Sequence, residues 1–248
     1  IPGAAPTGDV IGNDQVRILT VIPQFRDPRT IEVACRTGEH ELVGETVVIG
    51  TGSRPYRHRS IPFDDVSILD ADGFERAAGS RRVAIVGAGR DGLRCAALLA
   101  TAGVEGIVFD RRRRLLEECD SELADSLIET MVRDRGIELR LGEDVTACTP
   151  AAGRTVSLEL ADGNVEHVEQ VIVCMGRIGN TESVRLDRVG LETDERGRLW
   201  CDERFGLPSI RFGLWDRSSV FPRPCEHRWT RGPVVRSTYF LRAASTMV

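Results

Sequence analysis

The residues best suited to chemistry form a glycine-rich hexapeptide, Gly87-Ala88-Gly89-Arg90-Asp91-Gly92. Its G-x-G-x-x-G spacing is typical of turns that bind the pyrophosphate of a dinucleotide. Gly87 permits the tight turn, Gly89 lets the backbone approach the phosphates, and Gly92 lets helix and strand pack closely. The alternative is a glycine turn in an ordinary strand–helix–strand unit.

An acidic residue follows at a matching distance. Asp110 stands eighteen residues after Gly92, and about 20 is the spacing of an acid that binds the adenosine ribose. Arginines occupy the next four positions, 111 to 114. The Asp110 carboxylate favours the free 2′-hydroxyl of NAD, whereas an arginine such as Arg111 accommodates the 2′-phosphate of NADP. The choice between the two nucleotides stays open, as does a solvated loop as the role of the arginine run.

The other reactive side chains form no motif. All 33 basic residues are arginine, which excludes a Schiff-base lysine and a P-loop lysine. The seven cysteines lie more than twenty residues apart, so we expect small buried hydrophobes in a reducing compartment. The four histidines share no ligand or triad spacing, so no metal site is expected and no catalytic residue is assigned.

Length and charge limit the class of protein. A chain of 248 residues predicts one or two domains. A net charge of -5 argues against nucleic acid or an anionic membrane as the main partner. No apolar stretch reaches the ~18 to 20 residues of a membrane span, and the first residues lack a signal-peptide pattern. These features predict a cytoplasmic protein.

The spacing of apolar residues predicts the helices and strands that position the glycine turn. A buried strand over 83–86, a helix over 93–102 and a second strand over 107–109 predict a strand–helix–strand unit around it. Beyond it we predict a helix over 121–135, a strand over 137–141, a hairpin over 156–165 and a buried strand over 171–175. Residues 30–49 predict two or three strands, and residues 54–80 a crossing between domains.

Four segments together resemble the flavoprotein disulfide reductase family. They are VVIGTGSRPYR at 47–57, GAGRDG at 87–92, RLLEECDSELADSL at 114–127 and CMGRIGNTESVRLDRVGLETDERGRL at 174–199. The resemblance covers roughly residues 25–205 and is greatest to the transhydrogenase branch. Dihydrolipoamide dehydrogenase-like flavoproteins are the near alternative.

The resemblance implies an α/β fold in which a Rossmann-like NAD(P)-binding domain (61–172) is inserted in an incomplete FAD-binding domain (1–60 and 173–205). It places Thr51, Gly52 and Ser53 near the flavin and Gly176 near the nicotinamide. The implied cofactors are FAD and NAD(P), and the implied activity passes hydride from NADPH to NAD through the flavin. A homodimer is expected of the family.

Departures from the family pattern predict a truncated chain of doubtful activity. No second G-x-G-x-x-G is present to hold the FAD diphosphate, the C-terminal dimerisation domain is absent, and Arg94 stands where the family usually has a glutamate. Residues 206–248 form a divergent tail with little helix or strand period. Back-translation of 214–222 with a two-nucleotide shift approaches the family's next flavin motif except for its aspartate. Our hypothesis is therefore a one-nucleotide slip near Phe205 or Gly206, with a genuine divergent terminus as the alternative.

Two other functions fit the same residues. One is an isolated module that holds NAD(H) without catalysis, and the other is a non-functional coding fragment. Bound flavin would distinguish the enzyme from both.

Overall fold

The structure is a computed structural model that divides the chain into two compact units, residues 55–176 and residues 1–54 with 177–248. The described residues are 11–13, 16–19, 21–35, 38–44, 46–117, 119–151, 153–201, 206–207, 212–214, 220–221 and 238–241. Most of the predicted divergent tail, including most of the segment 214–222 used for the frame-slip hypothesis, lies outside them.

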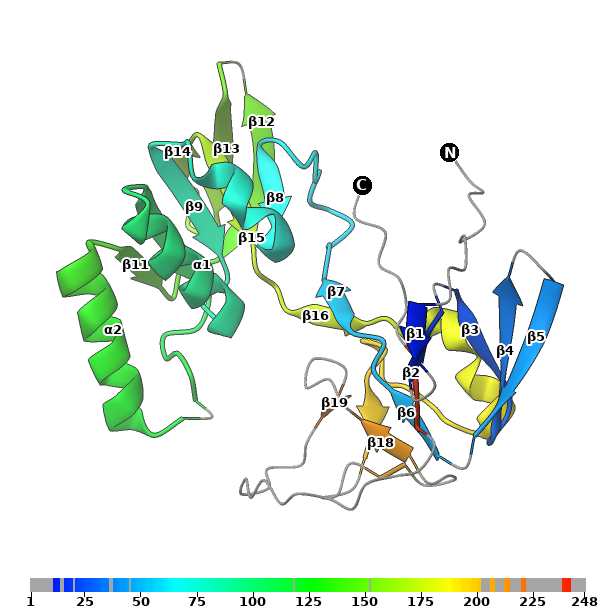
Figure 1. Ribbon diagram of the computed structural model, residues 1–248. Helices are drawn as coiled ribbons and strands as arrows, with labels where there is room; N and C mark the ends of the chain where they lie inside the picture. Colours follow the sequence, from blue (N-terminus) through cyan, green and yellow to red (C-terminus); the bar gives the residue numbers. More distant parts are fainter. Residues whose placement is uncertain are drawn as a thin grey trace. The chain divides into compact units, whose positions relative to one another are not determined.

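The unit of residues 55–176 is built on a five-stranded parallel sheet in the order β11-β10-β9-β15-β8 (Figure 1). The central strand is β9 (Arg82–Val86), whose last four residues are all buried. Such a continuous apolar run is typical of a parallel strand covered on both faces. The remaining strands are β8 (Ile68–Asp70), β10 (Glu105–Asp110), β11 (Glu138–Leu141) and β15 (Gln170–Val173).

Helices cover one face of this sheet and an antiparallel meander covers the other. Val83 and Ile85 share a core with helices α1 (Arg90–Thr101), α2 (Ser121–Arg135) and the 3₁₀ helix η1 (Ala71–Ala77). Ala84 and Val86 instead pack against the meander, because successive side chains of a strand point to opposite faces. The meander consists of β12 (Val145–Ala151), β13 (Thr155–Leu160) and β14 (Val165–Val168). This mixed α/β arrangement with a parallel sheet confirms the predicted fold class.

Three expectations for this unit need adjustment. Helix α1 begins at Arg90, three residues earlier than predicted. The predicted hairpin is two strands of a three-stranded sheet, since β12 pairs with β13. The crossing expected over 54–80 contains strand β8 and helix η1. A strand of three residues is too short to show a period, so the sequence pattern missed it.

Asp64 fixes the entry into β8. Its carboxylate accepts the backbone N–H groups of Val66 (2.9 Å), Ser67 (2.8 Å) and Ile68 (2.8 Å), and also the Ser67 hydroxyl. Partial burial by itself raises the pKa of Asp64, but these hydrogen bonds outweigh it and lower the pKa to about 2. Asp64 therefore stabilises the fold through its charged form.

We expect Asp64→Asn to lower the free energy of unfolding by about 1 kcal/mol at pH 7, because hydrogen bonds to an ionised carboxylate are stronger than those to a neutral amide. Because the folded pKa lies below the ordinary 3.8, the difference from wild type is fully present above that value and disappears as the pH falls toward 2. Urea unfolding at several pH values measures it. A difference that grows on acidification would contradict this role.

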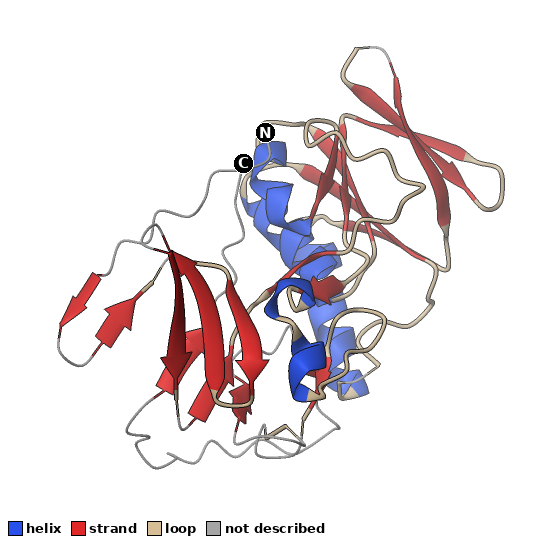
Figure 2. Cartoon of the chain, turned by 90° about the vertical axis from the view of Figure 1, so that its right-hand side faces the viewer, coloured by secondary structure: helices blue, strands red, loops and turns tan. Residues whose placement is uncertain are grey.

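The unit of residues 1–54 and 177–248 contains an antiparallel sheet β3-β4-β5 and a parallel sheet β18-β6-β20. Phe25, Ile31 and Val47 are among the buried residues of its core. Figure 2 colours the helices and strands of the chain. The elements of the unit are β1 (Ile11–Asn13), β2 (Val16–Ile18), β3 (Pro23–Asp27), β4 (Thr30–Cys35), β5 (Gly38–Val43), β6 (Thr46–Ile49), β7 (Ser53–Pro55), β16 (Arg177–Gly179), η2 (Glu182–Val184), η3 (Leu186–Val189), β17 (Leu199–Trp200), β18 (Phe212–Leu214), β19 (Val220–Phe221) and β20 (Thr238–Leu241).

The predicted tail contributes three of these strands, β18, β19 and β20. Strands β18 and β20 pair in parallel with opposite edges of β6. Two to four residues are too few to reveal a strand period, which explains why the sequence pattern did not indicate them. Within the described residues, no helix is both long and apolar enough to cross a membrane.

Candidate functional site

The glycine turn lies at the carboxyl edge of the parallel sheet. Val86, the last residue of β9, is in register with Phe109 of β10 and with Val173 of β15. Gly87 then turns the chain with φ +104° and donates its N–H to the Phe109 carbonyl at 2.8 Å. In open α/β sheets ligands bind outside the carboxyl ends of the strands, next to the point where the strand order reverses.

The three glycines of the turn are required for different reasons. A Cβ on Gly87 would lie 2.4 Å from the Cys174 carbonyl oxygen, and a Cβ on Gly92 would lie 1.8 Å from the Gly87 carbonyl oxygen. A Cβ on Gly89 would meet nothing within 4 Å. The fold itself therefore excludes side chains at two of the positions, whereas at Gly89 it leaves open space.

The same open space faces the start of α1. Gly89 is the N-cap residue of this helix and supplies no side-chain hydrogen bond to the first turn. The first N–H groups of a helix have no partner within the helix, and the helix dipole adds positive potential there. A phosphate group satisfies both requirements. The residues of the turn therefore fit the pyrophosphate of a dinucleotide.

Asp110 ends β10 beside the turn and is almost fully buried. Its Oδ2 accepts the Ala88 N–H at 2.8 Å and the Arg112 Nη2 at 2.8 Å. Its Oδ1 accepts the Arg112 backbone N–H and Nε, each at 2.9 Å. A carboxylate offers about four acceptor positions, so these four donors occupy it, and a ribose hydroxyl must displace one of them.

Arg112 is the arginine that forms this bidentate pair. Burial by itself raises the pKa of Asp110, but the hydrogen bonds from Arg112 and Ala88 outweigh it and hold the pKa below its usual range. Arg111, the residue chosen from the sequence, is exposed. A run of four arginines contains no signal that tells which of them reaches the carboxylate.

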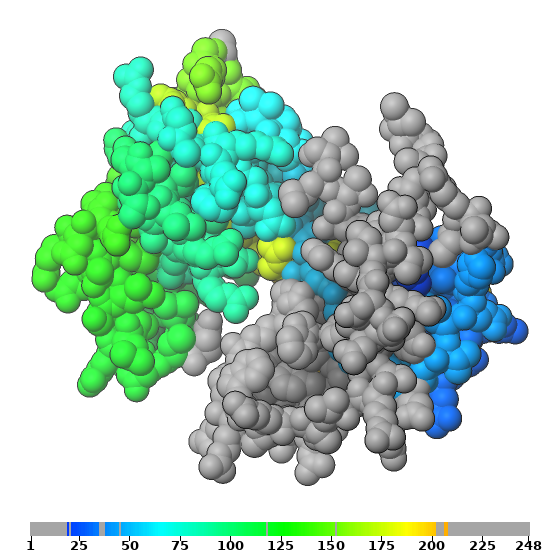
Figure 3. All heavy atoms as spheres, viewed as in Figure 1, coloured from blue at the N-terminus to red at the C-terminus, as the bar shows by residue number. Residues whose placement is uncertain are grey.

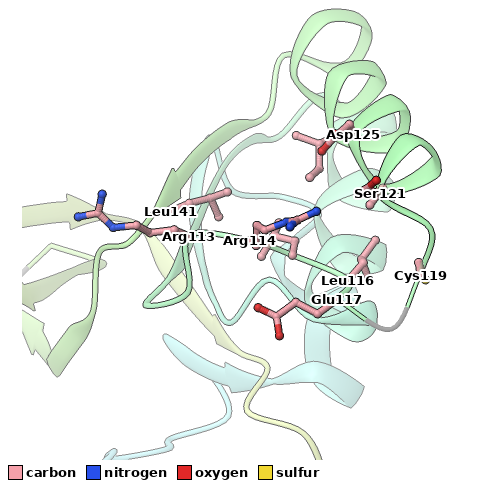
Figure 4. A pocket seen from close by; sticks show the side chains of 11 residues that line it. Arg113, Arg114, Leu116, Glu117, Cys119, Ser121, Asp125 and Leu141 are labelled. Atoms are coloured by element: carbon pink, nitrogen blue, oxygen red, sulfur yellow. The ribbon is translucent and has the colours of Figure 1, made fainter. Parts of the chain in front are cut away.

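A pocket of about 500 Å³ lies on the α2 side of the segment that follows β10. Figure 4 shows Arg114 extending across it toward α2, whereas Arg113 points the other way. Leu115, Ile128 and Leu141 give it apolar walls, and Ser121 and Asp125 add polar groups. None of the three turn glycines lines it.

In the other unit, a set of hydrogen bonds from Arg177 and Asn180, called the clasp below, holds residues 51–53. Arg177 donates from Nε to the Ser53 hydroxyl at 2.7 Å and from Nη2 to the Ser53 carbonyl at 2.8 Å. Asn180 donates its backbone N–H to the Gly52 carbonyl at 3.0 Å and its amide Nδ2 to the Thr51 carbonyl at 3.2 Å. The segment RIGN at 177–180 therefore fixes the turn TGS at 51–53. Both segments belong to the family resemblance, but nothing in the sequence indicates that one holds the other.

The Thr51 hydroxyl is the feature of this clasp that fits a cofactor. It is buried and, among the described residues, has no hydrogen-bond partner. A buried hydroxyl without a partner costs about 1 to 3 kcal/mol, and a polar edge of a bound flavin would supply a hydrogen-bond partner.

Two glycines selected from the sequence have positive φ. Gly52 turns the chain with φ +72°. Gly176 has φ +95° and accepts the Tyr56 N–H at 2.8 Å.

The structure thus places the residues selected from the sequence in separate groups. Gly87, Gly89, Gly92 and Asp110 meet at one edge of the 55–176 unit, and Thr51, Gly52 and Ser53 form a turn in the other unit. The cysteines differ among themselves: Cys95, Cys148 and Cys174 are buried as expected, but Cys119 is exposed. Among the described residues, no group of three or more potential ligands could hold a metal ion.

The parallel sheet, the glycine turn and the acidic residue at the end of the next strand define a dinucleotide-binding α/β protein. The chain belongs to the pyridine nucleotide-disulphide oxidoreductase family, whose model matches residues 10–209. This confirms the resemblance noted from the sequence, and with it FAD and NAD(P) as the cofactors of the family. The match ends inside the segment that we predicted to be divergent.

Curated relatives are soluble pyridine nucleotide transhydrogenases. The protein from Mycobacterium bovis (strain BCG / Pasteur 1173P2) is 33% identical over 204 residues, covering 79% of this chain and 43% of the relative. The protein from Pseudomonas aeruginosa (strain LESB58) is 32% identical over 204 residues, covering 82% of this chain and 43% of the relative. The chain therefore spans less than half the length of these relatives.

Solved structures show the same fold. LpdA from Mycobacterium tuberculosis superposes with a TM-score of 0.65 at 22% identity, covering 85% of this chain and 44% of that one. The flavoprotein disulfide reductase RclA from Escherichia coli gives a TM-score of 0.65 at 20% identity. That comparison covers 79% of this chain and 44% of RclA.

Proposed function

We propose that this chain binds a pyridine nucleotide at Gly87–Gly92 as part of a flavin-dependent oxidoreductase of the transhydrogenase type. The observation that carries the proposal is the contrast within the turn. Gly89 faces open space beside an uncapped helix start, whereas Gly87 and Gly92 have no room for a side chain. In this assignment residues 55–176, cyan to yellow-green in Figure 3, are the NAD(P)-binding domain, and the other unit is the FAD side.

Each group of residues has a defined task in this proposal. The turn and the start of α1 hold the pyrophosphate, and the Asp110–Arg112 pair meets the adenosine ribose. Thr51, Gly52 and Ser53 lie along the flavin, held in place by Arg177 and Asn180, and Gly176 lies toward the nicotinamide. Bound flavin supplies the two-electron chemistry that passes hydride from NADPH to NAD.

Two measurements on the purified chain test the proposal. Calorimetric titration of the chain with NADPH and with NADH should show saturable binding. Addition of FAD should give a chain that retains a yellow chromophore and reduces a thio-NAD analogue with NADPH. If no pyridine nucleotide binds, the proposal is wrong.

An isolated nucleotide-binding module is the second candidate. The unit of residues 55–176 has its own sheet with both faces covered. In this case pyridine nucleotide binds with unchanged affinity whether or not FAD is present, and no chromophore is retained. A dihydrolipoamide dehydrogenase-like activity would instead require reduction of a lipoamide analogue.

The nucleotide preference should depend on Arg112. We expect Arg112→Gln to weaken NADPH binding about tenfold or more, because a charge-assisted contact to the 2′-phosphate is worth ~1.5 to 3 kcal/mol. The same change frees Asp110 for the ribose hydroxyls, so NADH binding should strengthen or stay the same. Calorimetric titration of both nucleotides gives the ratio. Arg111→Gln is the matched control, and a larger effect in that variant would assign the 2′-phosphate to Arg111 instead.

A further inference from the structure

The glycine that follows β11 binds the backbone of the segment that carries the Asp110–Arg112 pair. Gly142 comes directly after Leu141, the last residue of β11, which is in register with Asp110 of β10. The Gly142 N–H donates to the Asp110 carbonyl at 2.7 Å and to the Arg112 carbonyl at 3.2 Å. One donor on the neighbouring strand therefore joins the two ends of the segment 110–112.

The backbone conformation at this position favours glycine. Gly142 has a φ of +82°, in the left-handed region that residues with a Cβ rarely adopt. A Cβ here would lie 3.2 Å from the Cγ of Arg113, an exposed side chain that can move aside. A residue that returns to negative φ must rotate the peptide planes around position 142, including the one that carries the donating N–H.

The arginine pair depends on the segment that this N–H holds. The Asp110 Oδ1 accepts the backbone N–H and the Nε of Arg112, each at 2.9 Å, and the Oδ2 accepts the Arg112 Nη2 at 2.8 Å. The two residues are only two positions apart, so their side chains meet only while the backbone between them keeps its turn. The Gly142 N–H closes that turn from outside.

The end of β11 is itself fixed against its neighbours. Arg140 is in register with Phe109, and its guanidinium lies 5.5 Å from the centroid of the Phe109 ring. The Arg140 Nη1 also lies 3.1 Å from the carboxylate of Glu166 on β14. The Gly142 N–H is therefore presented by a strand end that contacts with two other strands hold in place.

We propose that Gly142 is a positioning residue that sets the nucleotide preference of the site by holding Arg112 on Asp110. With its hydrogen bonds in place, Arg112 is ordered before NADPH arrives with its 2′-phosphate. Without them Arg112 must be ordered on binding, and the Asp110 carboxylate gains room for the ribose hydroxyls of NADH. The preference rests on the proposed function, whereas the effect of Gly142 on the Asp110–Arg112 pair does not.

Nucleotide titration of Gly142→Ala tests the preference. NADPH should bind about three- to tenfold more weakly, the cost of ordering one long side chain on binding, and NADH should bind equally or more tightly. Gly103→Ala is the matched control, because Gly103 has a φ of +81° and nothing within 4 Å of its Cβ position. Both variants should lose similar stability, but only Gly142→Ala should change the affinity ratio. An unchanged ratio in Gly142→Ala, or an equal change in Gly103→Ala, would overturn the proposal.

Titration of the Asp110 carboxyl carbon by NMR, without nucleotide, tests the positioning itself. Burial by itself raises the pKa of Asp110, but hydrogen bonds from Arg112 and Ala88 hold it below its usual range. The pKa should therefore rise in Gly142→Ala and keep its wild-type value in Gly103→Ala and in Gly142→Asn, since asparagine tolerates positive φ. A wild-type pKa in Gly142→Ala would overturn the positioning role. Absence of nucleotide binding by wild type overturns the proposed function, while this titration still decides the role of Gly142.

Amide exchange in the wild-type chain tests the same link without a substitution at position 142. Coupling between two groups is reciprocal, so NADPH, which engages Arg112, should slow exchange of the Gly142 N–H, and NADH should slow it less. Equal exchange of this N–H with and without bound NADPH would overturn the proposal even if Gly142→Ala failed to fold.

Discussion

Gly89→Val is expected to abolish measurable binding of NADPH and NADH while leaving the protein folded. The φ of Gly89 is -75°, an ordinary value for any residue, and its Cβ position meets nothing within 4 Å. The Cβ of the new side chain therefore enters the space assigned to the pyrophosphate without meeting a protein atom. We expect the affinity to fall at least about 100-fold, because the displaced phosphate contacts are charge-assisted, and the melting temperature to stay within a few degrees of wild type.

Gly79→Val is the matched control for this variant. Gly79 also has no neighbour within 4 Å of its Cβ position and lies outside the turn. Its replacement should change neither affinity nor stability. Calorimetric titration and thermal unfolding of both variants give the comparison. Wild-type affinity in Gly89→Val would place the nucleotide elsewhere.

Gly92→Ala should, in contrast to Gly89→Val, lower the stability of the fold. The added methyl group would lie 1.8 Å from the Gly87 carbonyl oxygen and 3.0 Å from its carbon. Both are backbone atoms of the same turn, so α1 must move away from β9. Overpacking in a tight core costs about 1 to 3 kcal/mol, and a clash with backbone belongs at the upper end of that range.

For a unit of this size we expect the melting temperature to fall by roughly 10 °C. Circular dichroism during thermal unfolding measures the shift, and Gly89→Ala is the control that adds the same methyl group where space exists. An unchanged melting temperature in Gly92→Ala would mean that α1 and β9 are less closely packed than the structure shows.

These variants distinguish two roles of the glycines in the motif: open space beside the turn, and close packing of α1 against the strands. The G-x-G-x-x-G pattern marks three glycines alike, but of the three only Gly89 has open space at its Cβ position. Gly87 and Gly92 maintain the close contact of α1 with the ends of β9 and β15. A loss of binding in a Gly87 or Gly92 variant would therefore not locate the nucleotide by itself.

Local patterns predicted the fold well where elements are long and regular. The strand-turn-helix around residue 87 and helix α2 follow from contiguous residues, because apolar spacing reports directly on which face is buried. Strand β8 and the tail strands escaped prediction because each has only two to four residues. Their positions depend on pairing with strands far away in the chain.

The sequence by itself determined the class of the protein, since the glycine spacing, Asp110 and the four family segments are local features. Only the tertiary structure decided which side chains complete each group. It selected Arg112 from four adjacent arginines, and it joined Arg177 to Ser53 across 124 residues. The first choice depends on how the chain turns after β10, and the second on the pairing of β7 with β16; neither is encoded by residue spacing along the chain.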